Sequence, residues 1–227
     1  MIFNLEYSET VVLVGAGPVS DALFKVAESH GKIFIAVDGG GNSVTAYGMI
    51  PDAVIGDMDS LSDAARAMIS PNRLLQIAEQ DSTDFDKAVR NLKAPLILAI
   101  GFTGARLDHE LAALHVLARY PHQPIVLLGE EDVTVHLPRS LDLHLEPGTR
   151  LSLFPLDAVT VFLEGLRWSF EALDLHPIRR IGTSNEVAQP KVRLGANAPG
   201  GLLIVPHCSL NAVIAGLRKV DFHSPPG

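Results

Sequence analysis

The chain has 227 residues, of which 47% are hydrophobic and 19% are charged, and its net charge is −8 at pH 7. This composition is typical of a folded globular protein with a buried core, and it excludes a disordered chain. The acidic balance argues against broad binding to nucleic acid, which needs a basic surface. The single cysteine, Cys208, excludes an intrachain disulfide and suits a reducing compartment.

The apolar runs of the chain are all far shorter than the roughly 18 residues that a membrane-spanning helix needs. The N-terminal segment carries Glu6 and Glu9 and has no basic stretch before its first apolar run. A secretory signal peptide begins with such a basic stretch. We therefore expect no signal peptide, no membrane association and a cytoplasmic location.

The first part of the chain alternates predicted strands with predicted helices. Short apolar runs predict buried strands at residues 10–15, 33–37, 53–55, 74–78, 96–100 and 125–128. Helical spacing of apolar residues predicts helices within 18–31, over 61–69, over 85–92 and over 107–117. Continuous apolar strands between helices indicate a parallel sheet that is covered on both faces.

The character of the sequence changes between Val133 and Pro147. The segments become shorter and glycine-punctuated, and they predict strands at residues 151–154, 159–163, 191–194 and 202–205. The predicted fold class is α/β plus all-β. It consists of a mostly parallel N-terminal sheet with helices on both faces and a small C-terminal β-sandwich or barrel. We place the two domains at residues 1–135 and 136–227.

Four polar clusters follow predicted strands of the α/β part, at residues 38–42, 56–60, 80–87 and 101–109. Ligands of open parallel sheets bind beyond the carboxyl ends of the strands, so these clusters mark one expected edge. The first, Asp38-Gly39-Gly40-Gly41-Asn42, offers backbone amides for phosphate or ribose. It can equally be a turn with a capping aspartate.

The second cluster, Gly56-Asp57-Met58-Asp59-Ser60, contains two carboxylates at Asp-x-Asp spacing. In an extended segment both carboxylates point the same way, and paired carboxylates suit Mg²⁺ with substrate phosphates. The alternative is that Asp59 or Ser60 caps the helix that follows.

The remaining two clusters combine acids with cations. Asp84 and Lys87 lie one helical turn apart, which suits a joint metal and phosphate site or a plain surface ion pair. In the fourth cluster, Arg106 is suited to clamp phosphate, and Asp108 to orient it or bind metal. Glycines that lead into a helix also attract anions.

A competing motif, Gly15-Ala16-Gly17-Pro18-Val19-Ser20, is similar to a dinucleotide-binding fingerprint. Ser20 stands in place of the third glycine, and this interpretation leaves the acidic clusters without a role. Taken together, the four clusters favour Mg²⁺–nucleotide chemistry, in which catalysis is mainly positioning and charge neutralisation.

The ordered motifs at residues 38–42, 56–60, 80–88, 101–109, 165–168 and 183–186 resemble those of the thiamine pyrophosphokinase family. The resemblance implies an α/β domain joined to a β-domain, in a homodimer whose site lies between the α/β domain of one chain and the β-domain of the other. It implies Mg²⁺ as cofactor and transfer of the pyrophosphoryl group of ATP to the thiamine hydroxyl, with release of AMP.

The resemblance also implies a role for individual residues. The metal ligands would be Asp57, Asp59 and Asp84. The catalytic residues would be Asp84, Lys87, Arg106 and Asp108. ATP would be bound by Asp38, Gly39, Gly40, Asn42, Gln80, Thr103 and Arg106. Thiamine would be bound by Trp168, Ser184 and Asn185, since an indole face suits a cationic ring; a core tryptophan is the commoner alternative.

Two other functions stay open from the sequence. An Mg²⁺-dependent phosphoesterase fits the Asp-x-Asp pair, although such sites usually carry more histidine ligands. A non-catalytic nucleotide-binding protein needs fewer acidic residues than this chain has.

Overall fold

The computed structural model describes residues 4–79 and 81–222, which fall into two compact units. The first unit comprises Met1–Val116 and Leu127–Glu130, and the second comprises Leu117–Val126 and Glu131–Gly227. The strand β8 (Ile125–Leu128) therefore contributes residues to both units. A domain boundary after residue 135 stays a prediction.

The first unit is built on a parallel sheet with the strand order β7-β2-β3-β4-β5. Its strands are β2 (Val11–Val14), β3 (Ile33–Val37), β4 (Ala53–Gly56), β5 (Leu74–Gln76) and β7 (Ile97–Ile100). Nearly all residues of β2, β3, β4 and β7 are buried, as expected for strands that are covered on both faces. A separate parallel pair is formed by β1 (Leu5–Glu6) and β6 (Leu92–Lys93).

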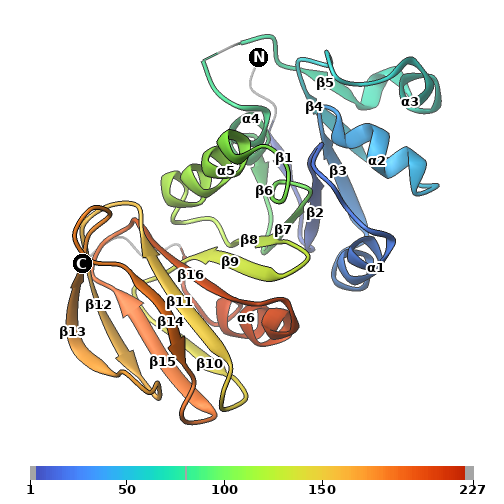
Figure 1. Ribbon diagram of the computed structural model, residues 1–227. Helices are drawn as coiled ribbons and strands as arrows, with labels where there is room; N and C mark the ends of the chain where they lie inside the picture. The colour runs from blue at the N-terminus through green and yellow to red at the C-terminus, as the bar shows by residue number, and fades with distance from the viewer. Residues whose placement is uncertain (1–3, 80, 223–227) are drawn as a thin grey trace. The chain divides into compact units, whose positions relative to one another are not determined.

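The helices of this unit lie on both sides of the sheet, with α4 and α5 on one side and α1, α2 and α3 on the other (Figure 1). They are α1 (Asp21–His30), α2 (Gly40–Ala46), α3 (Asp63–Met68), α4 (Asp84–Arg90) and α5 (Leu107–Arg119), with a 3₁₀ turn at Pro71–Arg73. Side chains of Ser20, Ser62 and Thr83 accept hydrogen bonds from the first turns of α1, α3 and α4. The predicted α/β organisation is confirmed.

The second unit contains two runs of antiparallel strands, β10-β15-β12-β13 and β14-β11-β16-β9. The strands are β9 (Asp132–His136), β10 (Leu141–His144), β11 (Arg150–Pro155), β12 (Val159–Glu164), β13 (Phe170–Leu175), β14 (Gly182–Glu186), β15 (Lys191–Ala196) and β16 (Gly201–Pro206). In β10 and β12, buried and more exposed residues alternate, as a sheet with one face on a core requires. This organisation agrees with the predicted C-terminal β-domain.

The second unit also contains helical segments that the sequence patterns did not predict. After a 3₁₀ turn at His207–Ser209, helix α6 (Leu210–Leu217) packs against β10. Gly216 allows this close packing, because a Cβ there would lie 2.8 Å from the carbonyl oxygen of Asp142. Only the short 3₁₀ turn separates this helix from the apolar strand β16 (Gly201–Pro206), so the apolar residues of the two elements do not show a clear helical period.

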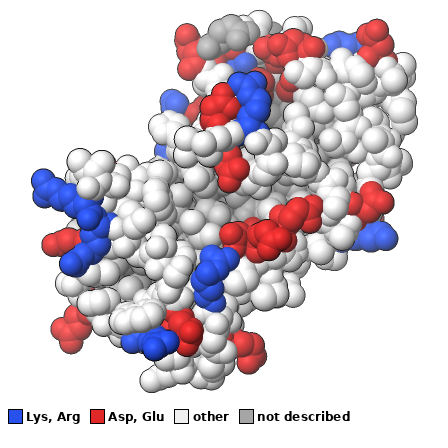
Figure 2. Space-filling view, in the orientation of Figure 1, with Lys and Arg blue, Asp and Glu red and all other residues white. Residues whose placement is uncertain are grey.

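Among the described residues, the structure contains no helix that has both the length and the apolar character needed to cross a membrane. On the face shown in Figure 2, Lys and Arg side chains form small separate groups, with Asp and Glu side chains lying between them.

The protein should become less stable in acid because of His136, which lies at the end of β9. Burial, and to a lesser extent His122, lower its pKa to about 4 from the ordinary 6.5. Between these pH values the unfolded state binds a proton that the folded state does not bind, so the free energy of unfolding falls as pH falls. From pH 7 to pH 5 this amounts to about 2 kcal/mol. Urea unfolding at pH 7 and at pH 5 measures this effect. Between these two pH values, the free energy of unfolding of His136→Gln should fall by about 2 kcal/mol less than that of the unsubstituted chain. An equal loss in the two proteins would contradict this assignment.

Candidate active site

The polar loops of the first unit follow parallel strands at their carboxyl ends. Asp38 follows β3, Asp57 follows β4, residues 79–83 come after β5, and residues 101–106 follow β7. Because all of these strands run in the same direction, their loops lie at one edge of the sheet. The prediction that the four clusters share an edge is confirmed.

Three carboxylates converge at this edge. Asp38, Asp57 and Asp59 each place one carboxylate oxygen within 4.8 Å of the other two. Asp38 is 7% exposed, and its buried Oδ1 has no hydrogen-bond partner among the described residues. Leaving a buried carboxylate oxygen unpaired is unfavourable, and a divalent cation with oxygen ligands would satisfy it. This acid cluster therefore fits a metal such as Mg²⁺.

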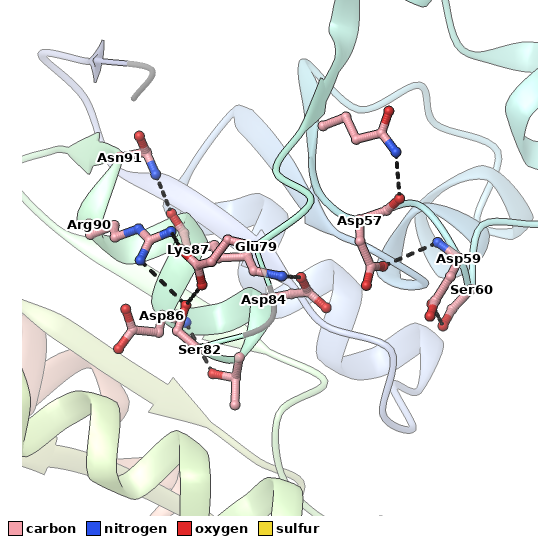
Figure 3. Close-up of polar contacts among 12 residues, drawn as sticks. Asp57, Asp59, Ser60, Glu79, Ser82, Asp84, Asp86, Lys87, Arg90 and Asn91 are labelled. Atoms are coloured by element: carbon pink, nitrogen blue, oxygen red, sulfur yellow. Dashed lines mark hydrogen bonds and ion pairs between the residues drawn. The ribbon is translucent and has the colours of Figure 1, made fainter. Parts of the chain in front are cut away.

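The backbone of the Asp-x-Asp segment differs from the extended form that we predicted. Met58 has φ 69°, so the segment turns between the two aspartates. The backbone N–H of Asp59 donates to Asp57 Oδ1 over 3.2 Å, which brings the two residues together (Figure 3). The prediction of an extended segment was wrong, and a tight turn brings the two carboxylates together instead. Neither Asp59 nor Ser60 caps the next helix, because Ser62 does.

Side chains from three other segments hold this turn in place. Asn42 donates to the carbonyl oxygen of Ser60 (2.8 Å) and accepts from the N–H of Ser62 (2.9 Å). The Arg66 side chain donates to the carbonyl oxygen of Met58, and the Gln76 side chain donates to that of Asp57. Each of these hydrogen bonds is 3.0 Å long. Motifs predicted Asn42 as an ATP contact, and they gave no role to Arg66 and Gln76, since no short motif marks a contact that is 8 or 19 residues away.

The glycines after Asp38 begin helix α2 rather than forming an open turn. A Cβ at Gly40 would lie 1.9 Å from the carbonyl oxygen of Val14, so the helix packs directly on the backbone of β2. A Cβ at Gly56 would lie 2.8 Å from Cβ of Asp38, so this glycine lets the neighbouring strand approach the acid cluster. Gly40 and Gly56 therefore have a packing role that places Asp38. Gly39 lies between Asp38 and Gly40 and is the N-cap residue of α2.

Asp84 and Lys87 form the ion pair that was predicted from their spacing. Lys87 Nζ lies 2.9 Å from Asp84 Oδ1, and the lysine side chain is 2% exposed (Figure 3). Burial raises the pKa of Asp84, and the charges of Asp57 and Asp38 raise it further, while Lys87 acts in the opposite direction. The surface alternative is wrong, because this lysine is buried. The carboxylates of Asp57 and Asp38 thus act on Asp84 electrostatically, in the direction that disfavours its charge.

The segment before α4 is tied to that helix. Ser82 and Arg90 both donate hydrogen bonds to the Glu79 carboxylate, and they lower its pKa in that order (Figure 3). Thr83 caps α4, because its side chain accepts a hydrogen bond from the backbone N–H of Asp86. The predicted ATP-binding residue Gln80 lies outside the described residues.

The loop after β7 presents an exposed ion pair at the start of α5. Arg106 Nε and Nη2 lie 3.1 and 2.7 Å from the two carboxylate oxygens of Asp108, in a bidentate arrangement. The contact with Arg106 is the main cause that lowers the pKa of Asp108. Both side chains are exposed, so solvent weakens the pair and leaves Arg106 accessible to an anion. Thr103 lies half-buried in the same loop.

The second unit has a separate cavity of about 320 Å³ that Trp168 and Asn185 both line. Asn185 Nδ2 donates to the carbonyl of Trp168 (2.8 Å), and Asn185 Oδ1 accepts from the N–H of Trp168 (3.2 Å). Trp168 is 50% exposed, and Arg167 lies 5.0 Å from its ring centroid. The core alternative for Trp168 is therefore wrong. Ser184 does not line the cavity; its N–H donates to Ser152.

Fold and site together define the class as an α/β protein that carries a carboxylate site suited to a metal, followed by an antiparallel β-domain with an aromatic cavity. Residues 24–128 match the family model of the thiamin pyrophosphokinase catalytic domain, and residues 132–198 match that of its vitamin B1 binding domain. The chain belongs to the thiamine pyrophosphokinase family.

Named relatives and solved structures agree with this placement. The chain is 27% identical over 205 residues to thiamine pyrophosphokinase 1 of Arabidopsis thaliana, covering 74% of this chain and 76% of that protein. It is 31% identical over 168 residues to thiamine pyrophosphokinase 1 of rice, covering 65% and 63%. The thiamin pyrophosphokinase structure from Geobacillus thermodenitrificans has a TM-score of 0.70 at 25% identity, covering 87% of this chain and 96% of that one. The Candida albicans structure, with a TM-score of 0.75 at 13% identity over 90% and 93%, supports the fold alone.

Proposed function

We propose that this chain is an enzyme that transfers the pyrophosphoryl group of ATP to the hydroxyl of thiamine, giving thiamine diphosphate and AMP. The observation that carries the proposal is the acid cluster of Asp38, Asp57 and Asp59, in a chain that matches both domain models of the family. A cluster of carboxylates next to a buried lysine suits a magnesium–polyphosphate complex.

The proposed metal site consists of Asp38, Asp57 and Asp59, with Asp84 beside them. The unpaired, buried Oδ1 of Asp38 supports adding this residue to the metal ligands, instead of assigning it to the nucleotide. When bound, Mg²⁺ would neutralise phosphate charge and polarise the phosphorus that is attacked. The chain itself would position the acids through Asn42, Arg66 and Gln76, which fix the turn that carries Asp57 and Asp59.

The remaining nucleotide contacts are proposed for residues at the same sheet edge. Arg106 is accessible and carries a planar, bidentate donor, so it is suited to exchange Asp108 for a phosphate oxygen. Lys87 would keep Asp84 ionised beside the metal. Thr103 and Gln80 remain proposed ATP contacts, and Asp108 and Asp84 remain candidates for accepting the hydroxyl proton.

Thiamine is proposed to bind in the cavity of Trp168 and Asn185, with Ser184 nearby in sequence. Its cationic thiazolium ring would stack on the indole face. Trp168→Ala should weaken thiamine binding about tenfold, because the aromatic face is removed and no hydrogen bond of the cavity replaces it. Calorimetric titration with thiamine and with Mg²⁺–ATP checks this. The thiamine affinity of Trp168→Phe, which retains an aromatic ring, should lie between that of Trp168→Ala and that of the unsubstituted chain. A selective loss of ATP affinity in Trp168→Ala would contradict the stacking role.

We further propose a cytoplasmic homodimer in which each site combines the α/β part of one chain with the β-part of the other. A complementation experiment tests the shared site. Asp59→Asn chains should be nearly inactive, and Trp168→Ala chains should need about tenfold more thiamine. When the two are unfolded together and refolded as a mixture, part of the activity should regain the thiamine dependence of the unsubstituted chain. If the site lies within one chain, the mixture keeps the weaker thiamine dependence of Trp168→Ala.

A direct test of the reaction separates the nucleotides by anion-exchange chromatography after incubation with Mg²⁺ and ATP. AMP should accumulate only when thiamine is present, in equal amount to thiamine diphosphate. Formation of ADP would contradict pyrophosphoryl transfer. Hydrolysis of ATP that does not depend on thiamine would favour a phosphoesterase, and ATP binding without turnover would favour a nucleotide-binding protein.

A further inference from the structure

The second unit contains another, larger cavity, which has no role in the proposed reaction. Its volume is about 440 Å³, within the usual range of small-molecule sites. It shares no lining residue with the cavity of Trp168 and Asn185. Its walls are largely apolar and come from the end of β9, the end of β15 and the residues after α6; they include Leu137, Pro138, Ala196, Pro199, Val220 and Phe222. We call it the His136 cavity, because His136 also lines it.

His136 brings an unsatisfied hydrogen-bond donor to this cavity. The residue is 8% exposed, and the backbone N–H of Gly200 donates to its Nε2 over 3.2 Å. An Nε2 that accepts a hydrogen bond is unprotonated, so the neutral ring carries its proton on Nδ1. That Nδ1 is buried and has no partner among the described residues. Buried donors are nearly always paired, so an acceptor is expected here.

The charged groups around the cavity favour an anionic acceptor. Arg139 and Lys219 line it, and both are exposed. Two acids, Asp142 and Asp221, line it as well. Asp142 is 3.9 Å from Arg193 Nε, a cation outside the lining, so its charge is partly balanced. The polar part of the cavity thus combines the N–H donor of His136 and two cations with two acids, of which Asp142 lies near Arg193. His122 and Ser140 also line the cavity.

We propose that the His136 cavity binds a small organic carboxylate with an apolar ring. The carboxylate accepts the hydrogen bond of His136 Nδ1–H and lies toward Lys219 and Arg139, and the ring packs against the apolar walls. This combination is the usual design of a small-molecule site, which has an apolar lining and a few convergent polar groups. The binding is independent of the proposed transferase reaction, since none of these residues belongs to the acid cluster.

Three probes of one shape test the chemistry, namely benzoate, benzamide and benzylamine. Each is titrated into the full chain labelled with ¹⁵N-histidine, and the His136 resonances are followed by NMR. Benzoate should bind with a Kd of about 1 mM, as expected for a fragment of this size, and should shift the Nδ1 signal of His136. Benzamide, a neutral acceptor, should bind about fivefold more weakly. Benzylamine, a cation, should produce no shift at His136.

Two variants assign the binding to the cavity. Lys219→Ala should weaken benzoate binding about fivefold, and Lys191→Ala, which removes a lysine of the same unit that does not line the cavity, should leave it unchanged. Both lysines are exposed, so neither variant endangers the fold. The proposal is overturned if benzylamine binds as well as benzoate, if benzoate leaves the His136 signals unmoved at saturating concentration, or if both lysine variants bind benzoate equally. None of these readouts depends on turnover of ATP or thiamine.

Discussion

Replacing Asp59 by asparagine should lower the rate of thiamine diphosphate formation by at least about 100-fold. Asp59 contributes one of the three carboxylates of the acid cluster, and asparagine offers a neutral amide oxygen of the same size. The side chain is exposed, so the variant should keep its free energy of unfolding within about 0.5 kcal/mol. Steady-state kinetics at several Mg²⁺ concentrations, with urea unfolding in parallel, measure both effects.

The matched control for this variant is Asp63→Asn. Asp63 is also an exposed aspartate and lies four residues further along the chain, in the first turn of α3 and outside the acid cluster. It should retain nearly full activity with an unchanged dependence on Mg²⁺. If Asp59→Asn is as active as Asp63→Asn at every Mg²⁺ concentration, Asp59 is not a metal ligand.

Replacing Lys87 by methionine should have the second large effect, on both stability and turnover. The lysine side chain is 2% exposed and its Nζ contacts Asp84 Oδ1 at 2.9 Å. Without this cation, the half-buried Asp84 faces the charges of Asp57 and Asp38 alone, and its pKa rises further. We expect a loss of about 1–3 kcal/mol in the free energy of unfolding. Turnover should fall about 100-fold, because loss of the lysine cation disfavours the anionic form of the acid beside the proposed metal.

A double variant separates the two effects of Lys87. In Asp84→Asn with Lys87→Met, no charge is left unpaired, so stability should recover relative to Lys87→Met while activity stays low. Lys93→Met serves as the control for loss of a lysine, since Lys93 is exposed on β6. Full activity in Lys87→Met would contradict a role for the pair in catalysis, and an unstable double variant would show that the ion pair is not what destabilises Lys87→Met.

Strands of the first unit could be predicted from the sequence because their signal is local. Runs such as residues 33–37 and 97–100 are continuously apolar and end at glycine or aspartate, which is typical of parallel strands buried on both faces. Helix α2 could not be predicted in this way. Its first residues are glycines, which have a low helix propensity, and it is packing on β2 that stabilises it.

Short strands of the second unit were only partly predictable. Four of them have apolar runs, whereas β13 and β14 are mostly exposed and carry polar residues such as Glu171, Asp174 and Asn185. Their pairing comes from partners that are far away in sequence, such as Leu151 with Asn185. A strand with polar residues on both faces shows no alternation of period two, so its sequence does not indicate a strand. Nor does its sequence indicate which distant strand it pairs with.

For the candidate site, residue types were predictable and contacts were not. The spacing of Asp84 and Lys87 correctly indicated their ion pair, since three residues make nearly one helical turn. The approach of Asp38 to Asp57 and Asp59 depends on the neighbouring positions of β3 and β4 and on the left-handed backbone of Met58. Neither feature has a signature in the sequence, and so Asp38 was predicted to bind the nucleotide.

In the proposed reaction the β-phosphorus of ATP is attacked, so that the two terminal phosphorus atoms of ATP move together. Phosphorus NMR of the enzyme with Mg²⁺, thiamine and β,γ-methylene-ATP distinguishes this attack from transfer of a single phosphoryl group. Attack at the β-phosphorus breaks only the bridge to the α-phosphorus, so AMP should appear together with a thiamine ester that retains the methylene-linked phosphorus pair. If the analogue stays intact while ATP yields ADP and thiamine monophosphate, the transfer is of a single phosphoryl group and the account is wrong.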